Sequence, residues 1–134
     1  MATQRLIPGS AVALLAQARA GLAEAAATWE VGERFRLAHL AALRVAAAVL
    51  ADRGRPAGAR RRLMSVWVVI DAVAPEFGDW SRFFAAGAPV RAAVEAGALH
   101  AVSRREADDQ VRAGEEFLRV VERSLGMLAA PLAS

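Results

Sequence analysis

The chain has 134 residues, of which 56% are hydrophobic but only 6% aromatic, so alanine and other small aliphatic residues make up most of the apolar content. All 17 basic residues are arginine, 14 residues are acidic, and the formal net charge is +3. This length predicts one domain over residues 1–134, with a core from about 10 to 128. The lack of cysteine excludes disulfides, a thiolate nucleophile and cysteine-bound zinc.

Charge is distributed unevenly along the sequence. Residues 1–67 contain ten arginines against four acids, or +6, whereas residues 68–134 contain seven arginines against ten acids, or −3. An anionic partner is therefore expected to bind the first half. Pro8 and Gly9 interrupt the first apolar stretch, and no segment has the length of a membrane span. We expect a cytoplasmic protein without a membrane partner.

Two long helices are predicted in the first half. Ser10 is expected to cap a helix that ends near Thr28. The second helix is expected from near Val31 to Asp52, because glycine and proline follow within Arg53–Pro56. The first helix has apolar residues at steps of four and three, which predict one buried stripe: Ala11, Leu15, Ala18, Leu22, Ala25 and Trp29.

The middle of the chain is harder to assign. Ser65–Ala74 is rich in β-branched residues, but we favour a buried helix because no second strand-like run could pair with it. Pro75 is expected to open a helix to Ala86, and Pro89 to restart a short one to about Ala96. The apolar side of this segment, which could line a pocket but more often forms core, comprises Phe77, Trp80, Phe83 and Phe84.

The last helix has the clearest pattern. Ser103 and Glu106 form a capping-box sequence, and pairs of acid and base at four-residue spacing, Asp108 with Arg112 and Glu115 with Arg119, are expected on its outer face. Its buried stripe is predicted at Ala107, Val111, Gly114, Leu118, Val121, Leu125 and Leu128. The whole sequence predicts an all-α single-domain bundle of four main helices plus a short broken helical segment.

Arg34 and His39 are the first candidates for chemistry. An imidazole could move the proton of an RNA 2′-hydroxyl while a guanidinium holds the phosphate. At about 100° per residue, His39 falls on the apolar stripe with Phe35, while Arg34 and Arg36 flank that stripe on opposite sides. A core or interface histidine is therefore the alternative interpretation.

The arginine-rich loop, residues 53–64, is the second candidate. Its guanidinium groups could hold phosphates through forked hydrogen bonds, although a solvated linker is the alternative. The residues concerned are Arg53, Arg55, Arg60, Arg61 and Arg62. His100 and the acids of the last helix are expected on the surface, so we predict no metal site and no cofactor.

Four blocks in order carry a family resemblance. They are Glu33–Arg44, the arginine run into Ser65–Val68, Trp80–Ala88, and Ser103–Asp109. Together they resemble the SAV-type actinobacterial branch of the HEPN superfamily, over about Gly21 to Glu122. The resemblance implies a bundle of four or five helices that commonly forms a homodimer.

Many HEPN domains are metal-independent endoribonucleases of toxin, antiphage or RNA-processing systems. The resemblance therefore implies an RNA-directed protein in which Arg34 and His39 form a catalytic pair across a dimer, with Arg36 accessory. Other members are inactive and serve in RNA or nucleotide binding or in assembly. The alternative function is accordingly a non-catalytic interaction or dimerisation module that binds a protein partner or RNA without cleavage.

Overall fold

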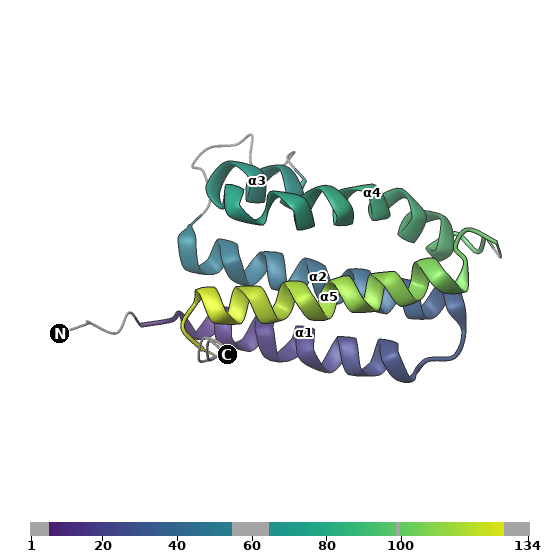
Figure 1. Ribbon diagram of the computed structural model, residues 1–134, viewed down its shortest axis with the longest axis horizontal. Coiled ribbons are helices and arrows are strands. Elements are labelled where there is room, and N and C mark those ends of the chain that lie inside the picture. Colours follow the sequence, from purple (N-terminus) through teal and green to yellow (C-terminus); the bar gives the residue numbers. More distant parts are fainter. Residues whose placement is uncertain (1–5, 55–64, 99, 128–134) are drawn as a thin grey trace, which may run out of the picture.

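The computed structural model describes residues 6–54, 65–98 and 100–127. The elements in order are α1 (Gly9–Ala27), α2 (Val31–Arg53), α3 (Val66–Val73), a short 3-10 helix η2 (Pro75–Phe77), α4 (Gly78–Glu95) and α5 (Arg104–Ser124) (Figure 1). These ranges contain no strand, which confirms the all-α class and the helical interpretation of Ser65–Ala74. None of these helices is both long and apolar enough to cross a bilayer.

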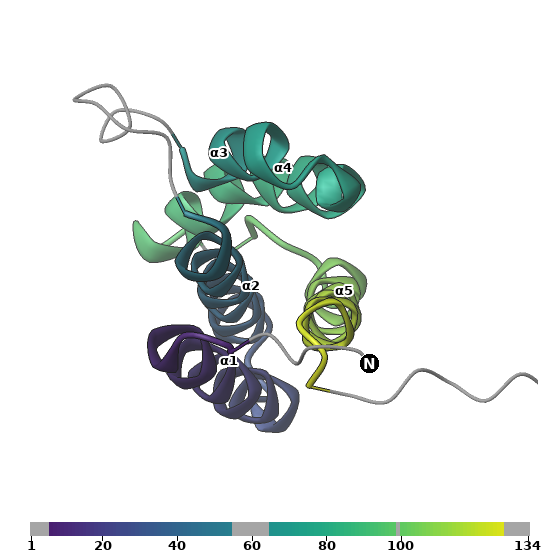
Figure 2. The ribbon, with the colours of Figure 1, turned by 90° about the vertical axis from the view of Figure 1, so that its left-hand side faces the viewer.

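Helix α2 lies at the centre of the bundle and packs against all four other α-helices. The view along the bundle shows α1 on one side of α2, α5 beside it, and α3 with α4 as a layer over it (Figure 2). Alanines line much of the contact between α1 and α2, including Ala18, Ala38 and Ala41, all fully buried. Small side chains let the two helix axes approach closely.

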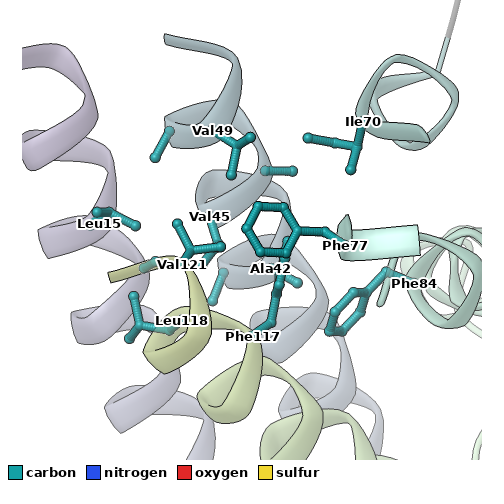
Figure 3. Packing of buried hydrophobic residues seen from close by; sticks show 14 of the residues in the cluster. Leu15, Ala42, Val45, Val49, Ile70, Phe77, Phe84, Phe117, Leu118 and Val121 are labelled. Carbon is teal, nitrogen blue, oxygen red and sulfur yellow. The ribbon is translucent and has the colours of Figure 1, made fainter. Parts of the chain in front are cut away.

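The core has an aliphatic half and an aromatic half. Leu15, Val45 and Val121 lie in the half between α1, α2 and α5 (Figure 3). In the other half the Phe117 ring of α5 contacts Phe84 and Trp80 of α4, with ring centroids 5.6 Å and 6.0 Å apart. These large rings fill the space between α4 and α5 and hold the two helices apart.

One predicted helix cap is confirmed, one is wrong, and a third cap was not predicted. Ser103 and Glu106 form the predicted capping box, and the Ser65 hydroxyl caps α3. Ser10 does not cap α1, because that helix already begins at Gly9 with Pro8 in the capping position. The Pro8 carbonyl accepts from the amides of Ala11 and Val12. The fixed φ of proline preorganises this start.

One expectation about an apolar stripe and one about a helix break were wrong. Trp29 is 84% exposed, because α1 ends at Ala27 and the helical periodicity no longer applies beyond it. Pro89 does not break the chain into two helices, since α4 runs through it from Gly78 to Glu95. Pro89 and Ala85 are both exposed, so water can satisfy the Ala85 carbonyl that loses its helical donor.

The predicted pair of Asp108 with Arg112 on the outer face of α5 does not form. Arg112 pairs with Asp109 at 2.5 Å, one turn earlier, and not with Asp108. Asp108 is bound instead by Arg34 of α2. The buried stripe of α5 is confirmed at every predicted position from Ala107 to Leu125, and Leu128 lies outside the described residues.

Truncating Phe117 should test the aromatic half of the core. We predict that Phe117→Ala lowers the free energy of unfolding by about 3–5 kcal/mol, because a fully buried ring is lost. Phe83→Ala is the matched control and should cost about 1 kcal/mol, because Phe83 is 42% exposed and loses one edge contact with Phe84. Urea unfolding measures both, and equal losses would contradict this description of the core.

Candidate functional site

The His39 side chain lies between α2 and α4 and is 0% exposed. The Phe35 ring stacks beside it at a centroid distance of 6.1 Å. Phe84 and Trp67 contact it edge-on at 6.3 Å and 6.4 Å. The predicted position on the apolar stripe is therefore confirmed, and three aromatic rings enclose the imidazole.

A hydrogen bond fixes the protonation of this imidazole. The Nε2 atom of His39 lies 2.8 Å from the carbonyl oxygen of Phe84. A carbonyl can only accept, so Nε2 carries the proton and Nδ1 is the basic atom of the neutral ring. Nδ1 is buried and has no hydrogen-bond partner. Burial lowers the pKa of His39, the bond to Phe84 opposes this, and the charge of Arg91 lowers the pKa further.

Gly87 allows α4 to cover the imidazole. A Cβ atom at this position would lie 3.1 Å from Cδ2 of His39 and 3.3 Å from Cζ of Phe35. Both distances are shorter than ordinary van der Waals contact, and both rings are buried. The backbone of α4 therefore closes over His39 at a point where any side chain would be crowded.

Arg34 connects three parts of the bundle. Its Nε donates to the carbonyl oxygen of Thr28 at 2.8 Å, just beyond the end of α1. Its Nη1 pairs with the carboxylate of Asp108 on α5. Arg34 and His39 thus reach toward different helices, α5 and α4, and the structure does not bring them together.

Arg36 forms a local pair. Its Nε lies 3.0 Å from Oε1 of Glu33, one turn earlier on α2. This hydrogen bond raises the pKa of Arg36, and burial partly opposes the effect. The guanidinium is therefore neutralised by its own helix and does not contact His39.

The arginine-rich loop is described only at its start. Arg53 is the last residue of α2, pairs with Glu76 and lies over the Phe77 ring at 5.5 Å. The hydrogen bond from Arg53 lowers the pKa of Glu76. Arg55, Arg60, Arg61 and Arg62 lie outside the described residues. Phosphate binding by this segment remains a prediction, and Arg53 would have to exchange Glu76 for the phosphate.

No group of three or more His, Asp or Glu residues in the described ranges could hold a metal ion. His100 is exposed in the turn before α5.

Sequence reasoning did not find the groove between α4 and α5. One part of it is lined by Phe35, Phe83, Ala86, Gly87, Val90, Glu106, Asp109 and Gln110. The adjoining part is lined by Asp79, Trp80, Phe83, Ala113 and Glu116. We call these residues together the α4/α5 groove. Its signal in the sequence was the spacing of Phe83, Ala86 and Val90 at steps of three and four, which the expected break at Pro89 concealed.

An all-helical bundle with a central histidine-bearing α2 is thus the class of protein that this structure defines. The family model for SAV_6107-like HEPN domains matches residues 25–122, which extend from the end of α1 almost to the end of α5. The chain belongs to this HEPN family. Searches of curated proteins and of solved structures gave no match.

The buried state of His39 predicts a particular dependence of stability on pH. The folded-state pKa lies below the ordinary value of 6.5, so the unfolded chain binds the proton more readily. His39 should not reduce the free energy of unfolding above pH 6.5. This free energy should fall as the pH drops from 6.5 toward the pKa of His39 in the folded chain. The lowered pKa values of Glu76 and Glu106 act only below their ordinary value of 4.5.

We predict that His39→Gln flattens this profile between about pH 8 and pH 5. Glutamine does not titrate and can still donate to the Phe84 carbonyl. Urea midpoints across this range measure the effect for both proteins. Parallel profiles would show that His39 titrates alike in the folded and unfolded chain, contrary to its enclosure.

Arg34 and Arg36 should differ in their effect on stability. Arg34→Ala should lower the free energy of unfolding by about 1.5–3 kcal/mol, because charged hydrogen bonds to Thr28 and Asp108 are lost. Arg36→Ala should cost about 0.5 kcal/mol or less, as expected for a partly exposed pair within one helix turn. Thermal or urea unfolding distinguishes the two, and equal losses would contradict the connecting role of Arg34.

Proposed function

We propose that this HEPN protein acts as a helical interaction module that binds another macromolecule, and that Arg34 and His39 serve its structure. The observation that carries the proposal is the complete burial of His39, with its Nε2 proton donated to the Phe84 carbonyl. The alternative is a metal-independent endoribonuclease assembled in a homodimer.

A general base for RNA cleavage must come within hydrogen-bond reach of a 2′-hydroxyl. The basic atom of His39 is Nδ1, which is buried between α2 and α4. Substrate could reach it only if the three rings around the imidazole separated. A second copy of the chain would have to stabilise that opened state for the ribonuclease alternative to operate.

The hydrogen bonds of Arg34 and Arg36 support the same proposal. A phosphate-binding arginine should be free to make a forked hydrogen bond. Arg34 is already bound to Asp108 and to the Thr28 carbonyl, and Arg36 is bound to Glu33. RNA that binds without cleavage would have to use other arginines, and the segment that contains Arg55, Arg60, Arg61 and Arg62 is the proposed place for it.

The test is cleavage of single-stranded RNA in EDTA by wild type, His39→Gln and His39→Ala. We expect His39→Ala to lose about 2–4 kcal/mol of stability, because a fully buried ring is removed. His39→Gln should stay folded at neutral pH and serve as the functional control. We expect none of the three proteins to cleave RNA.

RNA cleavage that depends on His39 would contradict the proposal. Cleavage by wild type that disappears in His39→Gln, while the urea midpoint of that variant at neutral pH is unchanged, would establish His39 as a catalytic group. The interaction-module proposal would then be wrong.

A further inference from the structure

The α4/α5 groove is an open, apolar channel between two helices whose other neighbours are already in place. Helix α4 packs on α2 and α3, and α5 packs on α1 and α2. Figure 2 shows α4 and α5 as separate helices, both beside α2. Phe83, Ala86 and Val90 supply its α4 wall, and Phe83 is 42% exposed there. A third helix laid between α4 and α5 would cover this wall.

An unsatisfied amide lies in the same groove. Gln110 of α5 is only 2% exposed and lines the groove, yet its Nε2 has no hydrogen-bond partner. A buried donor without a partner is unfavourable and uncommon. A ligand acceptor in the groove would satisfy it once the Gln110 side chain turned outward, because the nitrogen itself is buried.

The rim of the groove is acidic. Among the described residues, four carboxylates and no basic side chain line it: Asp79, Glu106, Asp109 and Glu116. Asp79 pairs with Arg82 and Asp109 with Arg112, each within its own helix. Hydrogen bonds from Ser103 lower the pKa of Glu106 below its ordinary value. The groove disfavours phosphate, and two copies of this face would repel each other.

We propose that the α4/α5 groove binds an amphipathic helical segment of a partner protein that carries arginine or lysine beside its apolar side chains. The apolar side chains would pack on Phe83 and Val90. One cation would lie near Glu116, and another would displace Arg112 from Asp109. A polar acceptor of the segment would meet the Gln110 amide once that side chain turned outward. This inference rests on the proposed interaction-module function and specifies its binding surface.

A foreign segment fits better than the basic half of a second copy. Several arginines of that half are already neutralised within their own chain: Arg19 by Glu122, Arg34 by Asp108, Arg36 by Glu33 and Arg53 by Glu76. Their transfer to a neighbouring groove would break these pairs.

The probe is a labelled synthetic peptide of about 15 residues with leucine on one helical face and arginine on the other. Its partner probe has glutamate in place of arginine. Fluorescence anisotropy should show binding of the arginine peptide to wild type and a dissociation constant at least about tenfold weaker for the glutamate peptide. In NMR spectra the side-chain amide signals of Gln110 should shift with the arginine peptide.

Two variants and two matched controls locate the binding. Phe83→Asp and Asp109→Asn should each weaken the arginine peptide, Phe83→Asp by about tenfold or more. Val12→Asp on α1 is the control for Phe83, since both residues are 42% exposed. Glu24→Gln on α1 is the control for Asp109. Neither control should change binding.

Three outcomes would overturn the proposal: no binding of the arginine peptide, equal binding of both peptides, or equal losses in the α1 controls. A dimer that Phe83→Asp converts to monomer would show that a second copy occupies the groove, which also overturns it. RNA cleavage that depends on His39 would refute the proposed function separately, because that assay does not involve the groove.

Discussion

The close approach of α4 to α2 at Gly87 determines most of what this bundle can do. It places the Phe84 carbonyl 2.8 Å from Nε2 of His39, and a Cβ atom at Gly87 would be crowded by the rings of His39 and Phe35. Because α4 is held on α2 in this way, and the Phe117 ring separates α4 from α5, the two helices remain apart and the α4/α5 groove stays open. The buried imidazole and the groove therefore have one structural origin.

Under the proposed function, the same contact gives the histidine of the expected sequence spacing a structural role. An arginine and a histidine five residues apart on one helix are compatible with catalysis and with packing alike. The tertiary contacts distinguish catalysis from packing. Arg34 contacts α5, His39 contacts α4, and the basic Nδ1 atom has no access to solvent. Membership of the HEPN family is thus consistent with a protein whose function is binding.

Local patterns predicted the helices well because periodicity, caps and breakers act within a few residues. The capping box at Ser103 and the burial of His39 both follow from such patterns. The break expected at Pro89 was wrong, since the exposed side of α4 tolerates a lost hydrogen bond. The pair of Arg34 with Asp108 joins residues 74 positions apart, and the unsatisfied Gln110 amide depends on what surrounds it in three dimensions. Neither leaves a local signal in the sequence.

The most direct test of the central claim is the imidazole nitrogen NMR spectrum of His39, recorded as the pH is lowered through 6.5. An enclosed ring bonded to Phe84 should give the neutral form with the proton on Nε2, and this signal should persist below pH 6.5. A ring that exchanges between both tautomers and titrates at its ordinary pKa would be open to solvent. That result would contradict the structural role of His39.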